Sequence, residues 1–192
     1  GVREDFFGLK INYHINDKLR ILFTGGFGFR KGAEYALRAM QELERLGIDY
    51  EFIVVGSHDE AQPLIEKYPT KGLKLIGFVP QDDLKEYLAT ADIYLFPSLC
   101  EGCASSGMEA MATGLPVIAT HESGLPIENG KNGIIVPSKD VESIVDAILT
   151  LKDNKSYRET LGKAACQLIS EHYTWKKYAE EVTGIYQDLL TE

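Results

Sequence analysis

The chain has 192 residues, of which 44% are apolar and 26% are charged, and its formal net charge at pH 7 is -9. This composition is close to that of an average globular domain and excludes collagen-like, mucin-like and intrinsically disordered chains. The negative charge disfavours nucleic acid as a partner, and the longest apolar runs, such as 53–55 and 134–136, are far shorter than the roughly 20 residues that span a bilayer.

Short apolar runs alternate with amphipathic stretches between about residues 19 and 136. The predicted strands are 20–24, 52–56, 74–76, 93–96, 117–120 and 133–136. Predicted helices start at Ala33 and stop before Gly47, cover 82–90 and cover 107–113, and apolar stripes predict that 138–192 is helical throughout. The sequence therefore predicts a doubly wound α/β domain: a parallel sheet of about six strands, helices on both faces and a helical C-terminal tail.

The loop after the first predicted strand combines glycines with two cations. Gly26 and Gly28 allow a close approach to the backbone, and Arg30 and Lys31 precede a helix whose N-terminus favours an anion. The spacing matches neither the G-x-G-x-x-G motif nor a P-loop. A phosphate site and a glycine-rich turn with two solvated charges both fit this pattern.

The loop after the fourth predicted strand carries two carboxylates eight positions apart, Glu101 and Glu109. A carboxylate such as Glu101, directly after an apolar strand, is costly unless it has a partner or a function. The backbone amides of Ala104, Ser105 and Ser106 are expected to point out of the helix start toward a diphosphate. Glu109 has a second interpretation, a capping box in which its carboxylate bonds the Ser106 amide.

Three cysteines are an odd number, which does not describe a disulfide framework and favours a reducing, cytoplasmic setting. Cys100 and Cys103 have the C-x-x-C spacing of a redox pair or half a zinc site, but the sequence offers no second ligand pair. Two small residues flanking a loop are the favoured interpretation. His121, in the loop after the fifth predicted strand, is expected to be a proton donor, a ligand contact or simply an exposed residue.

Taken in order, these loops resemble the C-terminal half of the retaining glycosyltransferases of family four, the group 1 family, whose two facing Rossmann-like domains make up the GT-B fold. Glu101 and Glu109 resemble the family's E-x7-E signature, and Lys31 with Gly32 resembles its phosphate-binding lysine loop. The resemblance implies one nucleotide-sugar-binding domain over 1–192. It consists of a crossover segment at 1–18, a sheet core with active-site loops at 19–137 and a helical tail at 138–192.

This resemblance also implies an activity and site residues. The chain would be the donor-binding domain of a retaining hexosyltransferase that uses a UDP- or GDP-linked sugar, without cofactor or metal ion, in glycan biosynthesis. Glu101 would be catalytic and hold the donor sugar, Glu109 would accept the ribose hydroxyls, and Lys31 would neutralise the diphosphate. The other implied donor-binding positions are Gly26, Gly28, Arg30, Phe78, Val79, Gly102, Cys103, Ala104, Ser105 and Ser106.

Some features stay open at this level. Gly26 stands where the family commonly has an arginine, and whether Arg30 replaces it is not decided by the sequence. The chain begins at Gly1 without a targeting signal, so we expect an excised piece that lacks the N-terminal acceptor domain and is inactive alone. The saccharide or glycolipid acceptor, and any contact with the inner membrane surface, would belong to that missing half. The alternatives are a non-catalytic nucleotide-binding module and another GT-B enzyme such as a nucleotide-sugar epimerase.

Overall fold

The computed structural model describes residues 1–191. The strands are β1 (Leu19–Thr24), β2 (Tyr50–Val55), β3 (Leu73–Gly77), β4 (Ile93–Phe96), β5 (Val117–Thr120) and β6 (Ile134–Val136). The helices are α1 (Ala33–Arg45), α2 (Gln62–Lys67), α3 (Gln81–Thr90), α4 (Ser105–Thr113), α5 (Val141–Asp153), α6 (Lys155–His172) and α7 (Trp175–Thr191). Short 3-10 turns occupy Glu4–Phe6, Asp59–Ala61 and His121–Ser123.

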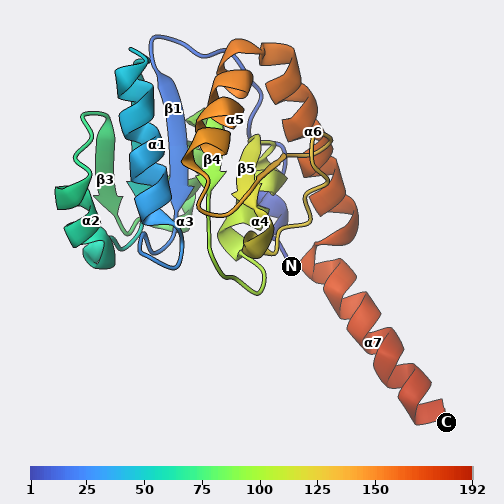
Figure 1. Ribbon diagram of the computed structural model, residues 1–192. Coiled ribbons are helices and arrows are strands. Elements are labelled where there is room, and N and C mark those ends of the chain that lie inside the picture. Colours follow the sequence, from blue (N-terminus) through green and yellow to red (C-terminus); the bar gives the residue numbers. More distant parts are fainter. Residues whose placement is uncertain (192) are drawn as a thin grey trace.

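The strands form one sheet in the order β3-β2-β1-β4-β5-β6, and every neighbouring pair is parallel. Figure 1 shows α1 and α5 side by side over the sheet, where they contact each other, while α3 and α4 form a second contacting pair. The doubly wound parallel sheet of six strands predicted from the sequence is therefore confirmed. Since all strands run the same way, every loop that follows a strand lies at one edge of the sheet.

Two expectations about helices need correction. The short helix α2 was not predicted, and α4 begins at Ser105, two residues before the predicted start. The predicted tail, 138–192, consists of the three helices α5, α6 and α7 as far as Thr191, and residue 192 lies outside the described part of the chain. The last helix, α7, projects away from the body of the domain (Figure 1). Its apolar stripe is therefore largely exposed at Trp175, Tyr178, Ile185, Tyr186 and Leu189. No helix within residues 1–191 is both long and apolar enough to cross a membrane.

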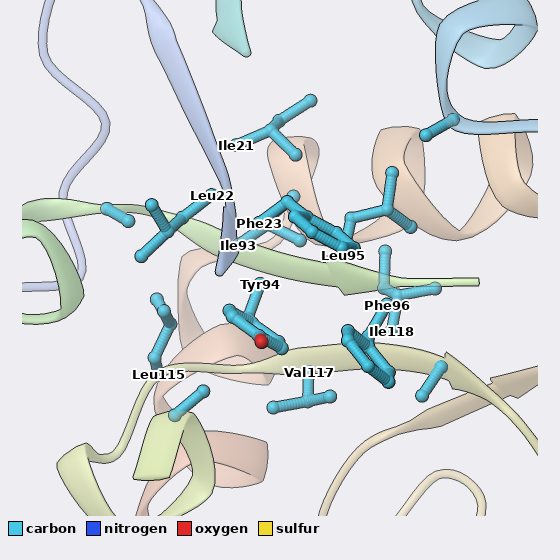
Figure 2. Close-up of a cluster of buried hydrophobic side chains, with 14 of the residues drawn as sticks. Ile21, Leu22, Phe23, Ile93, Tyr94, Leu95, Phe96, Leu115, Val117 and Ile118 are labelled. Carbon is cyan, nitrogen blue, oxygen red and sulfur yellow. The ribbon is translucent and has the colours of Figure 1, made fainter. Parts of the chain in front are cut away.

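The hydrophobic core includes the ends of β1 and β4, and Figure 2 shows Phe23, Tyr94 and Phe96 among its buried side chains. The rings of Phe23 and Phe96 stack with their centroids 5.5 Å apart, and Tyr94 stacks on Phe96 at 6.0 Å. The Tyr94 hydroxyl is 2.9 Å from Oγ1 of Thr24, and complete burial raises the pKa of Tyr94 to about 12. Large, fully buried rings at the ends of these two strands give the loops above them a rigid support.

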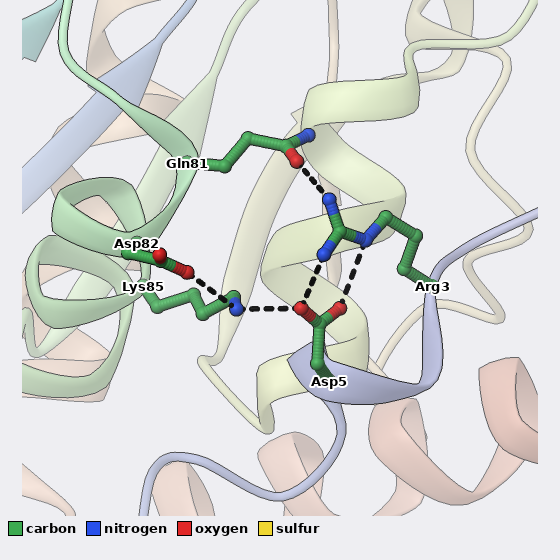
Figure 3. Close-up of polar contacts among 5 residues, drawn as sticks. All are labelled: Arg3, Asp5, Gln81, Asp82 and Lys85. Atoms are coloured by element: carbon green, nitrogen blue, oxygen red, sulfur yellow. Dashed lines mark hydrogen bonds and ion pairs between the residues drawn. The ribbon is translucent and has the colours of Figure 1, made fainter.

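Polar contacts hold the first residues of the chain against α3 (Figure 3). The carboxylate of Asp5 accepts hydrogen bonds from Arg3 at 2.6 Å and from Lys85 of α3 at 2.5 Å, and the Lys85 bond lowers the pKa of Asp5. Arg3 also donates to the side chain of Gln81 at the start of α3. The segment expected to be a crossover, 1–18, thus begins against α3.

Lys10 is a buried cation whose amine donates to the carbonyl of Ala91. Burial lowers the pKa of Lys10 from 10.5 to about 8, Asp92 opposes this change, and Arg158 and Arg20 reinforce it. Above pH 8 the folded chain has largely lost this proton, whereas the unfolded chain still carries it, so unfolding takes up a proton. The free energy of unfolding is therefore expected to rise by about 1.5 kcal/mol between pH 8 and 9.5. Urea unfolding at both pH values should show this rise, and Lys10→Met should remove it. An unchanged pH dependence in Lys10→Met would contradict the prediction.

Candidate functional site

The loops after β1 and β4 meet at the point where the order of the strands reverses. The chain runs outward from β1 to β2 and β3 on one side and from β4 to β5 and β6 on the other. A crevice at such a reversal is where open α/β sheets bind ligands. The two loops contact each other directly. The carbonyl of Arg30 accepts hydrogen bonds from the Leu99 amide at 2.8 Å and from the Ser98 hydroxyl at 3.2 Å.

Three of the predicted site residues come together in this crevice. Nη1 of Arg30 lies 2.6 Å from Oε1 of Glu101, and Nζ of Lys31 lies 3.7 Å from the same oxygen. The side chains of Lys31 and Glu101 are only 16% and 13% exposed, whereas that of Arg30 is 59% exposed. The ammonium of Lys31 also lies 5.0 Å from the centroid of the Phe96 ring. The carboxylate that the sequence left unexplained is therefore held by two cations.

A cavity of about 360 Å³ opens beside this cluster. Its lining includes four predicted residues, Gly26, Gly28, Arg30 and Lys31. Sequence reasoning missed the other wall, which Ser57, Asp59 and Glu60 contribute from the segment after β2. The available signal was their position directly after a predicted strand. A β-carbon on Gly28 would lie 2.5 Å from Oε2 of Glu60, so a larger residue at that position would displace the Glu60 carboxylate from this wall.

The start of α4 presents free amides, although fewer than expected. The Ala104 amide donates to the carbonyl of Ser123 at 3.2 Å, so the expectation that it points toward a ligand is wrong. Within residues 1–191 the amides of Ser105 and Ser106 have no acceptor. Glu101 is tied to the same neighbouring segment, because its amide donates to the carbonyl of Glu122 at 2.8 Å. The helix start remains a place where two backbone donors can meet an anion.

Glu109 does not take part in a capping box. Because α4 begins at Ser105, its N-cap is Ala104, which has no side-chain oxygen. The Glu109 carboxylate lies half-buried on α4, and no hydrogen bond or ion pair to it is found in the described part of the chain. Burial raises the pKa of Glu109, and the nearby positive charge of Arg3 acts in the opposite direction. A half-buried carboxylate without a partner is expensive unless a ligand supplies one.

The remaining predicted residues are more dispersed. Phe78 and Val79 follow β3, which β2 separates from β1, and the Phe78 ring is 94% exposed. Gly102 and Cys103 are exposed in the loop after β4, and Cys100 is an exposed free thiol in the same loop. His121 is exposed as well. No cluster of three or more potential metal-ligating side chains occurs among residues 1–191.

Comparison with known proteins adds an independent line of evidence. Residues 9–168 match the family model described as "Glycosyl transferases group 1". The chain is 34% identical over 196 residues to the amylovoran biosynthesis glycosyltransferase AmsK of Erwinia amylovora. That alignment covers 94% of this chain and 48% of AmsK, so the chain spans about half the length of this relative.

Solved structures share the fold at lower identity. The C-terminal domain of the group 1 protein LpcC from Francisella tularensis superposes with a TM-score of 0.78 at 22% identity, covering 91% of this chain and 100% of that domain. Anabaena HepE, solved in complex with UDP-glucose, superposes with a TM-score of 0.79 at 18% identity, covering 90% of this chain and 49% of HepE. Both likenesses concern the fold, and they agree with the doubly wound architecture described above.

Proposed function

Since the chain belongs to the group 1 family of glycosyl transferases, we propose that it is the donor-binding domain of a retaining hexosyltransferase and takes a nucleoside-diphosphate sugar. The single observation that carries this proposal is the partly buried group of Lys31, Glu101 and Arg30 at the reversal of the strand order. A few residues beyond Glu101, the Ser105 and Ser106 amides are free to donate hydrogen bonds to an anion. One site thus offers positive donors for a diphosphate and a carboxylate acceptor for sugar hydroxyls.

The proposed roles follow from this arrangement. The Lys31 ammonium and the amides at the start of α4 bind the diphosphate and stabilise the charge that develops on it as the glycosidic bond breaks. The Glu101 carboxylate accepts hydrogen bonds from the donor sugar near the reacting carbon. The Glu109 carboxylate accepts hydrogen bonds from the ribose hydroxyls. The segment of Phe78 and Val79 binds the base of the nucleotide. Gly26, Gly28, Gly102 and Cys103 border the same ligand through their backbone.

UDP is the first nucleotide to test, and the complex of HepE with UDP-glucose supports that choice. GDP is the alternative carrier. We further propose that binding needs no metal ion or cofactor, because fixed protein donors meet the diphosphate charge. The acceptor is a saccharide or glycolipid, bound chiefly by a separate N-terminal domain, and the chain alone transfers no sugar. We place this domain in the cytoplasm, with any contact to the inner membrane surface made by the N-terminal part.

Calorimetric titration of the chain with UDP, GDP, ADP and NAD, in EDTA and again with magnesium, tests the proposal. Saturable binding of one nucleoside diphosphate in EDTA is the expected result, and the nucleotide that binds identifies the base of the natural donor. Binding of NAD alone, or binding that requires magnesium, would contradict it. A non-catalytic module and an epimerase both predict nucleotide binding, and product analysis with the complete enzyme separates them from a transferase.

Glu109→Gln is expected to stabilise the free chain and to weaken nucleotide binding. The raised pKa of Glu109 means that its ionised form disfavours folding at pH 7, so removing the charge should raise the free energy of unfolding by about 1 kcal/mol and Tm by about 2–4 °C. Nucleoside diphosphate affinity should fall about tenfold, because an amide is a weaker acceptor for the ribose hydroxyls. Thermal unfolding and calorimetry measure both quantities.

Glu159→Gln serves as the control for this variant. Glu159 already bonds Lys163 at 2.6 Å, and this contact lowers its pKa, so its replacement should neither stabilise the chain nor change binding. Loss of stability in Glu109→Gln would instead identify Glu109 as a structural residue.

A further inference from the structure

We infer that Arg30 is a positioning residue, which orients Glu101 for the donor sugar and does not bind the donor diphosphate itself. This inference rests on the proposed function. It assigns the orientation of Glu101 to Arg30 and the binding of the diphosphate to the adjacent cation, Lys31. It assigns Arg30 a role different from the direct donor contact that the family resemblance implies.

Arg30 holds four consecutive residues of the loop after β4. Its backbone carbonyl accepts the hydroxyl of Ser98 at 3.2 Å and the amide of Leu99 at 2.8 Å. Its guanidinium donates to the carbonyl of Cys100 at 2.9 Å and to Oε1 of Glu101 at 2.6 Å. One residue therefore fixes both the path of this loop and the direction of its carboxylate.

The guanidinium suits this task better than an ammonium. Its N–H bonds lie in one plane and point in fixed directions, so the two hydrogens of one nitrogen can meet a backbone carbonyl and a carboxylate together, whereas a lysine offers a point charge on a flexible stem. Both contacts are made by the same nitrogen, Nη1. Nη1 of Arg30 is consequently committed within the loop, even though much of the side chain is exposed.

The carboxylate of Glu101 is left with one available oxygen. Both cations approach Oε1, and among residues 1–191 no hydrogen bond to Oε2 is found. Oε2 can therefore accept a sugar hydroxyl while Oε1 stays with Arg30. Lys31 is the better phosphate ligand of the two cations, because its 3.7 Å contact with Oε1 is too long for a hydrogen bond and leaves its donors free.

A double-mutant cycle tests this coupling. Arg30→Ala, Glu101→Gln and the double variant are titrated with UDP and UDP-glucose, and with GDP and GDP-mannose. We expect Arg30→Ala to weaken nucleotide-sugar binding about tenfold and nucleoside diphosphate binding less than about twofold. In the Glu101→Gln background, Arg30→Ala should cause no further loss, and Arg30→Lys should restore only part of the sugar affinity.

Two results of these titrations would overturn the inference. An equal loss for the nucleoside diphosphate and the nucleotide sugar would make Arg30 a direct phosphate ligand. Additive losses in the double variant would show that Arg30 and Glu101 act independently. Arg38→Ala is the matched control, since Arg38 forms a 3.7 Å ion pair with Glu34 on the surface of α1 and should leave both affinities unchanged.

Hydrogen exchange of the ligand-free chain gives a readout that needs no donor. Arg30→Ala should increase amide exchange several-fold at Glu101, whose side chain and preceding carbonyl lose the guanidinium, and Arg38→Ala should not. If the wild-type chain bound none of the four ligands, the proposed function would fail, but faster exchange would still support the positioning role. Unchanged exchange at the Glu101 amide would overturn that role whatever the titrations show.

Discussion

Replacing Lys31 with alanine is expected to weaken nucleoside diphosphate binding by about 10- to 100-fold, the effect of losing one hydrogen bond between charged groups. The Lys31 side chain is only 16% exposed, so its attraction for a phosphate is screened less than that of a surface lysine. Arg30 remains beside Glu101 at 2.6 Å, and the carboxylate therefore keeps a partner in the variant. Titration of Lys31→Ala with the diphosphate that the wild-type chain binds measures the loss.

The control for this prediction is Lys163→Ala. Lys163 pairs with Glu159 at 2.6 Å on α6 and is 69% exposed, so its removal should change neither binding nor folding. A Lys31→Ala variant that unfolds at the wild-type Tm and still binds with the wild-type affinity would refute the role given to Lys31. It would also move the diphosphate away from the crevice between β1 and β4.

The sheet could be predicted because its strands carry strong local signals. Strands β4 and β5 have the predicted bounds, since each is a short apolar run enclosed by residues that stop a strand, such as Pro97 after β4. Helix α2 has only six residues and a proline at its start, so the same stretch was not distinguishable from a loop. The stripe in α7 was visible as a pattern, but a periodic pattern does not tell whether its apolar face is covered.

The candidate site could be predicted in position and composition but not in its contacts. Parallel strands bring the loops with Arg30 and Glu101 to one edge of the sheet, which the sequence already implied. Which cation touches Glu101, across 71 positions of chain, depends on loop paths that no local rule describes. The capping box failed for a related reason. The bond from Ala104 to Ser123, a contact between two loops, accompanies a helix start two residues earlier than the motif requires.

The largest loss of stability is expected from Gly32→Ala. Gly32 adopts a φ of 75° directly before α1, and a β-carbon there would lie 2.0 Å from the carbonyl oxygen of Pro97. The backbone strain costs about 1 kcal/mol and the collision with another loop about 1–3 kcal/mol more, so Tm should fall by about 5–15 °C. Pro97 begins the loop that carries Glu101, and nucleotide-sugar binding should therefore be lost together with stability.

Gly47→Ala separates strain from collision. Gly47 has nearly the same φ, 73°, but nothing lies within 4 Å of its would-be β-carbon, so its replacement should cost only about 1 kcal/mol and leave binding intact. Thermal unfolding of the two variants isolates the contact between the loops after β1 and β4. If Gly32→Ala were no less stable than Gly47→Ala, these loops would not be in van der Waals contact. The two loops that carry Lys31 and Glu101 would then have to lie farther apart than they do in the structure.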